Sequence, residues 1–418
     1  MLRNIIKKKR VLFIPLITVL IFLLVSCNDE PTYMGSSLLL DTISIISVST
    51  EDTTLIESSN SFLYRLEIFN AGVMFLGKYN DLEAISMIRF SGIPDTLGSI
   101  TEADIDSVTL TLPLMRYAYG DDTLLSHSLS FKVYKVMKYW TNKTNWDTIF
   151  PSGSTTDYFD TKVLGTFDGE ISQEDEMKPM TLQIDKQLIA EWFKLSADSA
   201  TAGTIWGIAL VPDINSSVIR TLSAQAIDEL RIHPYLRITY RKKQDTLDTL
   251  ILQSAIDASV TNSNPPDENT LTVQGGISSR FKLSFDISII PDEAAIHVAE
   301  LDLHINKSAS QYGNYNLDST IAASLYLDSS YTSSFGNYYG GNDSNNRELY
   351  KFPKITSAVQ YWVTHGKKGV LVFSPEGFSN EYREFDKMVF YGMQTPDLTK
   401  RPAMRIIYST RPKFGIKK

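Results

Sequence analysis

Few residues of this chain have the types and spacing that catalysis needs. No nucleophile, metalloprotease or phosphate-binding loop motif occurs in its 418 residues. The five histidines are scattered, and their intervals match no recognised set of metal ligands. The single cysteine, Cys27, excludes an internal disulfide bond and a thiolate metal cluster. We therefore expect a protein that is not an enzyme.

A stretch rich in tyrosine, glycine and asparagine, YTSSFGNYYGGNDSNN at 331–346, has the composition of a recognition loop. Aromatic rings offer flat apolar faces to a sugar or a protein, and amides and carboxylates bond to hydroxyl groups. The predicted ligand-binding residues are Tyr331, Phe335, Tyr338, Tyr339, Asn342 and Asp343. The alternative is a surface loop whose tyrosines pack onto the fold.

A second candidate loop is MRYAYGDDT at 115–123, in which Asp121 and Asp122 offer carboxylate oxygens to Ca²⁺. Two adjacent acidic residues are also typical of a hairpin turn, which is the interpretation we prefer. Calcium is thus the one metal ion that the sequence suggests, and no other cofactor is expected.

The charge of the chain narrows the class of partner. Residues 1–26 contain five Lys or Arg and no acidic residue, so the remainder has 35 basic against 48 acidic residues, a formal charge of −13. Nucleic acid requires a basic surface and is not expected as a partner. A polyanionic glycan would also be repelled unless Ca²⁺ or a local basic patch intervened.

The first 26 residues have the organisation of an export signal. Five basic residues precede the apolar run at 11–25, which spans only about 22 Å as a helix, less than a bilayer core. Leu24-Val25-Ser26-Cys27 resembles the lipobox of bacterial lipoproteins. That resemblance implies cleavage before Cys27 and acylation of its thiol, so that the membrane is a partner through this residue.

The residues after the cysteine bear on location, and 27–40 are expected to form a polar tether. Asn28 stands where an aspartate would resemble an inner-membrane retention signal, and the acidic Asp29-Glu30 resembles a surface-export signal of some lipoproteins. We expect a lipid anchor in the outer membrane with the protein facing the cell exterior. A tether without targeting meaning is the alternative.

Past the tether, short alternating or β-branched runs indicate an all-β chain. In SVTLTLPL at 107–114, the valine and the leucines fall on one face and the threonines on the other, which is typical of a half-buried antiparallel strand.

A repeated order of segments divides the chain into two copies. The matching pairs are 87–94 with 283–291, 105–112 with 297–305, 188–193 with 358–363, 207–213 with 369–376, and 233–240 with 401–408. Five matches in the same order predict two homologous domains, 41–241 and 246–410, joined by the charged segment 241–248.

One short helix is expected in each copy. In 185–195, Leu188, Ile189, Trp192 and Phe193 share one helical face, and Asp185 can cap the start. The counterpart helix around Trp362 has Thr356 or Ser357 as its expected cap. Each tryptophan is expected to close one end of a core, and stacking on a sugar is the alternative role.

The order of these elements resembles the DNRLRE-type β-sandwich domains. The first copy carries the middle motif of that family at Val133, Val136, Trp140, Thr141 and Trp146, and the last one at 234–240. In the second copy, the tyrosine-rich stretch 331–346 replaces the paired tryptophans, and the Arg-Glu signature of the family is absent from 222–234. The resemblance implies two tandem jelly-roll-like antiparallel β-sandwiches and, for some members, binding of polysaccharides.

Ten tripeptides of the form Asp-(Ser/Thr)-X, such as Asp106-Ser107-Val108 and Asp248-Thr249-Leu250, resemble an O-glycosylation motif of exported bacterial proteins. Turn chemistry, in which Asp ends a turn and a β-branched residue opens a strand, explains the same pattern. Both interpretations stay open.

Taken together, these observations predict a non-catalytic, lipid-anchored surface protein that presents loops to a polysaccharide or to an envelope protein. The alternative is a structural or assembly subunit of an outer-membrane complex, and a glycan hydrolase is the least favoured hypothesis.

Overall fold

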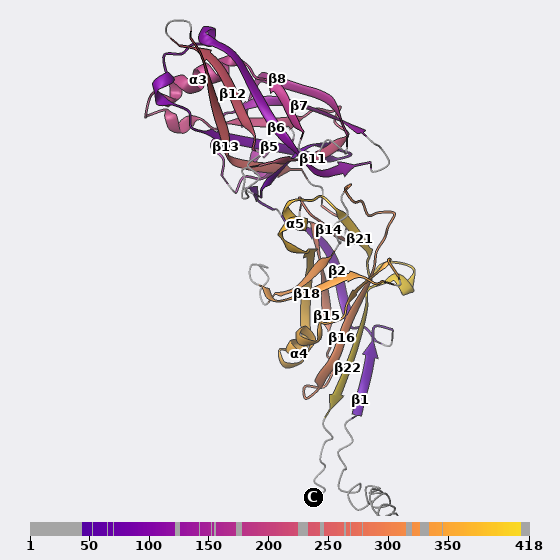
Figure 1. Cartoon of the computed structure of the whole chain (residues 1–418). Helices are drawn as coiled ribbons and strands as arrows, with labels where there is room; N and C mark the ends of the chain where they lie inside the picture. Colours follow the sequence, from indigo (N-terminus) through magenta and orange to yellow (C-terminus); the bar gives the residue numbers. More distant parts are fainter. Residues whose placement is uncertain are drawn as a thin grey trace, which may run out of the picture.

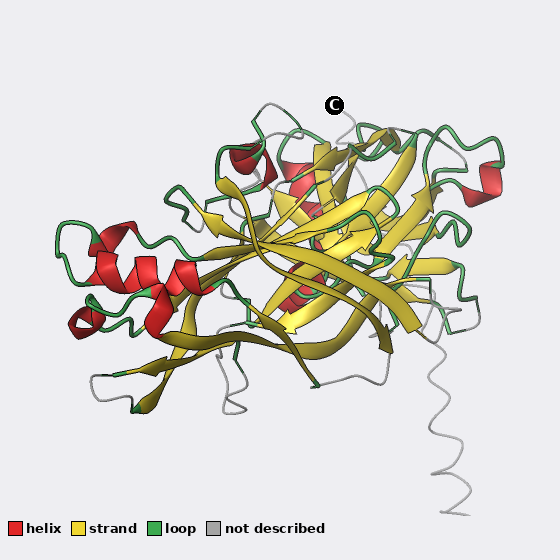
Figure 2. Ribbon diagram, turned by 90° about the horizontal axis from the view of Figure 1, so that it is seen from above, coloured by secondary structure: helices red, strands yellow, loops and turns green. Residues whose placement is uncertain are grey.

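The computed structural model describes residues 44–410, except 52, 65, 70, 122–125, 142, 152, 154–155, 173–177, 225–232, 243–245, 263–264, 268, 278, 315–319, 327–333 and 345. The predicted signal 1–26, Cys27 and the tether 27–40 lie outside these residues. Strands form most of the regular structure (Figure 2), and they pair antiparallel in two sheets. The prediction of an all-β chain is confirmed. In the part of the chain described, no helix has the length and apolar character needed to cross a membrane.

The two sheets lie end to end in an elongated molecule (Figure 1). We call residues 68–261 the first lobe. Its strands are β3 (Ile68–Phe69), β4 (Val73–Tyr79), β5 (Leu82–Ser91), β6 (Ile105–Gly120), β7 (Ser126–Val136), β8 (Phe159–Ser172), β9 (Pro179–Gln183), β10 (Ile208–Pro212), β11 (Val218–Ser223), β12 (Tyr235–Arg241) and β13 (Leu247–Thr261). Its helices are α2 (Trp146–Ile149) and α3 (Lys186–Ser196), with short 3-10 turns at 95–97, 102–104 and 202–204.

We call residues 44–63 and 270–410 the second lobe. Its strands are β1 (Ser44–Ser49), β2 (Ile56–Leu63), β14 (Thr270–Gln274), β15 (Ser279–Asp286), β16 (Ala295–His304), β17 (Ile321–Tyr326), β18 (Ser334–Asn342), β19 (Leu349–Phe352), β20 (Lys368–Pro375), β21 (Lys387–Tyr391) and β22 (Ala403–Thr410). Its helices are α4 (Thr356–Thr364) and α5 (Gly377–Tyr382), with a 3-10 turn at 398–400.

The strand pairing does not follow the division at 241–246 that the repeats suggest. The N-terminal strands β1 and β2 pair with β22 and β15 of the second lobe. The long strand β13 pairs with β12 through its first half and with β5 through its second half, so it belongs to the first lobe. The first lobe is therefore an insertion between β2 and β14, and the chain crosses the junction twice.

The two copies of the sequence pattern nevertheless make equivalent pairings. β10 pairs with β5 at Ile208 and Ile88, and β20 pairs with β15 at the matching positions Val370 and Ser284. The same holds for β12 with β6 and for β22 with β16. Shared partners in a shared register are what a duplicated strand arrangement produces, because a slip of one residue would turn each side chain to the other face.

The helices agree in part with the sequence. α3 spans Lys186–Ser196, and the Asp185 carboxylate accepts the Gln187 N–H as an N-cap. The cap predicted for α4 is wrong: its N-cap position is Ile355, because the Thr356 hydroxyl accepts the Ala299 N–H instead. Each lobe also has a helix beyond the one expected, α2 and α5. In α2 the Asn145 side chain accepts the Thr148 N–H, which starts a single turn.

Each lobe has its own apolar core. In the first lobe this core includes Trp192 of α3 beside strands β5, β6 and β10, and in the second it includes Trp362 of α4 beside the equivalent strands. A third apolar cluster, with Phe75 and Tyr119 of the first lobe and Phe385 of the second, fills the junction. The lobes are thus joined by packing as well as by two crossings of the chain.

Candidate functional site

The ligand-binding residues predicted at 331–346 lie mainly on a strand. β18 pairs with β17 from Gly340 opposite Ile321 to Ser334 opposite Tyr326. The expectation of a loop is wrong for this part, because Gly340 leaves room for the Phe352 ring, which packs directly against the backbone of the strand. A segment rich in glycine is therefore held in the sheet by a close aromatic contact.

Adjacent residues on a strand point to opposite faces, so Tyr338 and Tyr339 do not form one surface. The Tyr338 ring packs on the core of the second lobe, and its hydroxyl lies 2.9 Å from the Ser357 hydroxyl. Tyr339 is 55 % exposed. Phe335 lies on the same strand, and Tyr331 falls outside the described residues. Among the described members of this set, Tyr339 and Asn342 are exposed to solvent.

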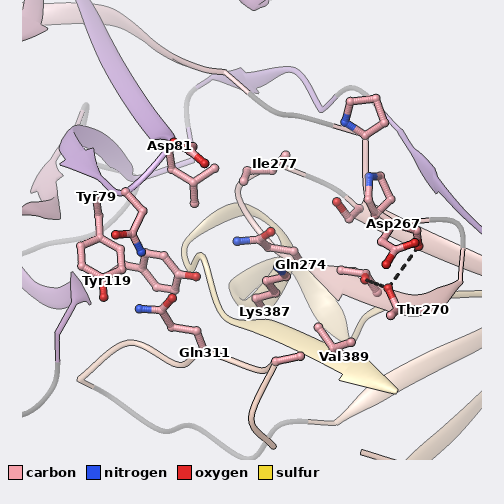
Figure 3. A pocket seen from close by; sticks show the side chains of 17 residues that line it. Tyr79, Asp81, Tyr119, Asp267, Thr270, Gln274, Ile277, Gln311, Lys387 and Val389 are labelled. Atoms are coloured by element: carbon pink, nitrogen blue, oxygen red, sulfur yellow. Dashed lines mark hydrogen bonds between the residues drawn. The ribbon is translucent and has the colours of Figure 1, made fainter. Parts of the chain in front are cut away.

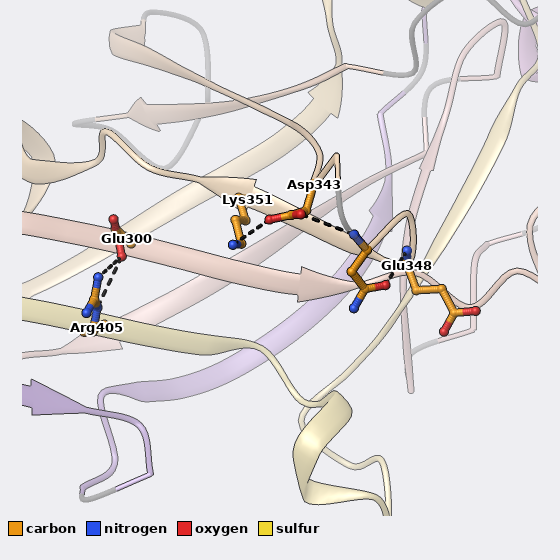
Figure 4. A network of polar contacts seen from close by, with 6 residues as sticks. Glu300, Asp343, Glu348, Lys351 and Arg405 are labelled. Atoms are coloured by element: carbon orange, nitrogen blue, oxygen red, sulfur yellow. Dashed lines mark hydrogen bonds and ion pairs between the residues drawn. The ribbon is translucent and has the colours of Figure 1, made fainter.

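The two polar residues of the set are used within the fold. Asn342 ends β18 opposite Tyr350 of β19. The Asp343 carboxylate lies 2.6 Å from Lys351 Nζ and accepts the Asn346 N–H, as Figure 4 shows. The same view shows the Glu300–Arg405 pair on β16 and β22. The charge of Asp343 thus stabilises the turn between β18 and β19.

The hypothesis of a calcium site rests on two residues, of which only Asp121 is described. Among the described residues, no group of three or more His, Asp or Glu is placed to hold a metal ion. Calcium at this turn stays a prediction. Trp192 and Trp362 are each 1 % exposed, so the expectation that they close the cores is confirmed and stacking on a sugar is excluded for both.

A cavity of about 480 Å³ lies at the junction of the lobes (Figure 3). The first lobe contributes Tyr79, Asp81 and Tyr119, and the second contributes Gln274, Gln311, Thr270 and Lys387 among others. In Figure 3 the two tyrosines and Gln311 face Asp267 and Thr270 across the cavity. Two of these side chains already form hydrogen bonds within the protein. Gln274 Nε2 donates to the Phe385 carbonyl, and Gln311 Nε2 donates to the Gly120 carbonyl at 3.3 Å.

Buried carboxyl groups lie beside this cavity, in the junction itself. The Tyr117 hydroxyl donates to Asp386 Oδ1 at 2.6 Å and accepts the Phe385 N–H at 2.7 Å, and the Gly313 N–H donates to the same carboxylate oxygen. Burial raises the pKa of Asp386, although the hydrogen bonds that its carboxylate accepts from Tyr117 and Gly313 oppose the shift. Burial and the nearby Asp386 charge raise the pKa of Glu384 to about 7. The Asp386 carboxylate thus links the lobes through Tyr117.

A cluster of aromatic rings surrounds one arginine of the first lobe. The Arg89 guanidinium carbon lies 5.4 Å from the Tyr139 ring centroid, 5.1 Å from that of Trp140 and 5.3 Å from that of Trp206. Arg89 Nη2 donates to the Trp140 carbonyl, and Trp140 Nε1 donates to the Trp206 carbonyl at 2.9 Å. We call Tyr139, Trp206 and the underlying Arg89 the aromatic platform. Cation–π contacts of this kind stabilise ring positions.

Sequence reasoning identified Trp140 as a motif residue but did not single out Tyr139, Trp206 or Arg89 as functional. A signal was present, because Tyr139 directly precedes Trp140. Arg89 and Trp206 are distant in the sequence and join the cluster only because β5 and β10 are paired. Of the cavity residues, Tyr119 falls in the candidate segment 115–123, whereas Tyr79, Gln274 and Gln311 gave no local signal.

The comparisons with known proteins give this chain no relative. No family model matches it, and no curated protein matches it. Among solved structures, one match is described as the structure of infectious bursal disease virus Gx strain, with 9 % identity over 90 % of this chain and 78 % of that chain. Its TM-score is 0.10, so nothing about fold or function follows from it.

Proposed function

We propose that this chain is a non-catalytic, lipid-anchored protein of the outer membrane that displays its first lobe at the cell exterior for binding. We also propose that each lobe is a jelly-roll-like sandwich, the pair forming a spacer and a display module. The observation that carries the proposal is the position of the insertion: the first lobe lies at the end of the molecule opposite to the strand that follows the tether (Figure 1).

The topology explains this polarity. β1 begins at Ser44 opposite Thr410, the last residue of β22, at the end of the second lobe that faces away from the first (Figure 1). Because the first lobe is inserted between β2 and β14, both of its chain connections leave from the opposite end. An anchor at Cys27 would therefore hold the second lobe near the membrane and project the first lobe outward.

The junction supports a role in display, since it is built to hold the lobes in a fixed relation. Ala118 N–H donates to Asn314 Oδ1 at 2.8 Å, and Arg383 Nε donates to the Ala71 carbonyl at 3.0 Å. Phe75 and Phe385 meet edge to face, with ring centroids 4.4 Å apart. Asp386, whose pKa is raised by burial, contributes to this contact by accepting the Tyr117 hydroxyl, which accounts for its burial without a catalytic role.

The test is to express the full chain in a Gram-negative host with an alkyne-labelled palmitate and to compare it with C27A. We expect label and membrane association for the parent, and neither for the variant. External protease should digest the first lobe on intact cells. Label that persists in C27A, or a first lobe protected until the outer membrane is opened, would contradict the proposal. Protein partners recovered in fixed ratio would favour an assembly subunit instead.

A further inference from the structure

The aromatic platform lies beyond the end of β7 that is remote from the junction. β6 reaches the junction at its end, where the Gly120 carbonyl accepts Gln311 Nε2. β7 starts beside that point, since His127 contacts Gly120, and it runs 10 residues to Val136, about 33 Å away. Tyr139 follows three residues later. The platform therefore lies away from the junction, in the lobe that a membrane-anchored chain would project outward.

The rings at this site keep an open face. Tyr139 is 58 % exposed and Met137 is 46 % exposed, whereas Trp140 beneath them is buried. Tyr139 and Trp206 meet edge to face, with centroids 5.1 Å apart and planes inclined by 68°. Trp206 is half-buried, so Tyr139 has the larger open surface and Trp206 supports it from the side. Exposed aromatic groups in contact with each other are a typical feature of recognition surfaces.

Two positively charged side chains at the platform, Lys138 and Arg89, have partners within the protein. Lys138 forms an ion pair with Asp157, and its Nζ also lies 5.3 Å from the Tyr158 ring centroid. The Arg89 charge is covered by three rings, and burial lowers the pKa of its guanidinium. The chain outside 1–26 carries a formal charge of −13. The net negative charge disfavours a polyanion, while the Lys138–Asp157 pair offers both donors and acceptors to hydroxyl groups.

We propose that the aromatic platform binds a neutral polysaccharide, whose sugar rings stack their C–H faces on Tyr139 and Trp206 while hydroxyl groups bond to Lys138 and Asp157. This inference rests on the proposed display function and assigns its ligand. Arg89 acts as a positioning residue: its guanidinium lies between the rings, and its Nε has no hydrogen-bond partner and is buried. Rings that are already ordered lose less conformational entropy on binding.

The experiment is affinity electrophoresis of the full chain in detergent, through gels that contain laminarin, xyloglucan or galactomannan as neutral probes and alginate as a polyanionic probe. We expect retardation by at least one neutral polysaccharide and none by alginate. Y139A should lower the association constant at least tenfold, whereas Y139F should keep it within about threefold, because stacking needs the ring and not the hydroxyl. The control is L398A, which removes a similarly exposed apolar side chain (69 % against 58 %) from the second lobe.

Each outcome decides the matter. Loss of retardation in Y139A alone, with an unchanged thermal unfolding midpoint, supports the proposal. Equal effects of Y139A and L398A, an effect of L398A alone, or no binding of any neutral probe overturns it, as does retardation by alginate that depends on Tyr139. Acylation and surface exposure are measured without any glycan. A failed binding experiment therefore leaves the display function standing. If acylation or surface exposure fails instead, binding can still be measured on the purified chain.

Discussion

The two lobes share a strand arrangement and differ in the segment that follows one pair of equivalent strands. β7 lies between β10 and β8, as β17 lies between β20 and β18. In the first lobe, the 22 residues 137–158 follow β7 and carry Tyr139 and Trp140; in the second, only 327–333 separate β17 from β18. The paired strands therefore fix where each connecting segment lies, and the sequence of that segment determines which side chains it exposes.

Shared positions can also have different physical reasons. Gly207 and Gly369 match in the sequence: Gly207 directly precedes β10, and Gly369 is the second residue of β20. Gly207 has a φ of +86°, and a Cβ there would overlap the Ile88 carbonyl. A Cβ on Gly369 would instead overlap the Trp362 indole. A repeat in sequence thus conserves the absence of a side chain, although the neighbour that requires it is backbone in one lobe and an aromatic ring in the other.

The largest expected effect tests whether α3 and α4 contribute equally to the stability of their lobes. Trp192 and Trp362 are each 1 % exposed, the first 6.1 Å from the Phe90 ring and the second stacked on Phe285 at 5.0 Å. W192A and W362A should each lower the free energy of unfolding by about 3–5 kcal/mol, because each leaves a large cavity. Guanidinium denaturation measures this. A loss above 3 kcal/mol in one lobe and below 1 in the other would break the equivalence.

The two glycines provide a sharper test of the difference. G207A and G369A should each cost about 2–3 kcal/mol, the first through backbone strain and the second through overpacking. Replacing Trp362 by Phe should recover at least about 1 kcal/mol in the G369A background, because the smaller ring frees space. Replacing Trp192 by Phe should recover nothing in the G207A background. Double-mutant cycles from urea denaturation give both coupling energies, and equal couplings would contradict this account.

The junction, which belongs to both lobes, should respond to pH. Burial raises the pKa of Glu384 to about 7 from an ordinary value near 4.5, so the folded chain holds a proton that the unfolded chain releases between these values. The free energy of unfolding should therefore fall by about 2 kcal/mol as pH rises from 4.5 to 7. E384Q should flatten this slope. Denaturation at pH 5 and pH 8 tests this, and a rise in stability with pH would contradict it.

The sequence predicted the features that depend on local periodicity. Alternation along 107–114 identified the strand β6, and the apolar face of 185–195 identified α3 together with its cap, Asp185. It could not predict that the N-terminal β1 pairs with β22, because strand pairing across more than 350 residues leaves no local signal. The aromatic platform could not be predicted for the same reason, because Arg89 and Trp206 become neighbours of Tyr139 only through sheet pairing.

The smallest expected effect concerns how each helix starts. In α3 the Asp185 carboxylate accepts the Gln187 N–H at 2.9 Å and lies 2.6 Å from Lys162 Nζ, whereas α4 has no side-chain cap. D185A should cost about 1 kcal/mol, and S357A in the second lobe less than about 0.5 kcal/mol, since the Ser357 hydroxyl faces Tyr338 and not the helix start. K162M separates the cap from the ion pair, because an exposed pair contributes little. Thermal unfolding of the three variants resolves these differences. If K162M cost as much as D185A, the ion pair and not the cap would hold the first turn, and the two helices would then start in the same way, without a capping side chain.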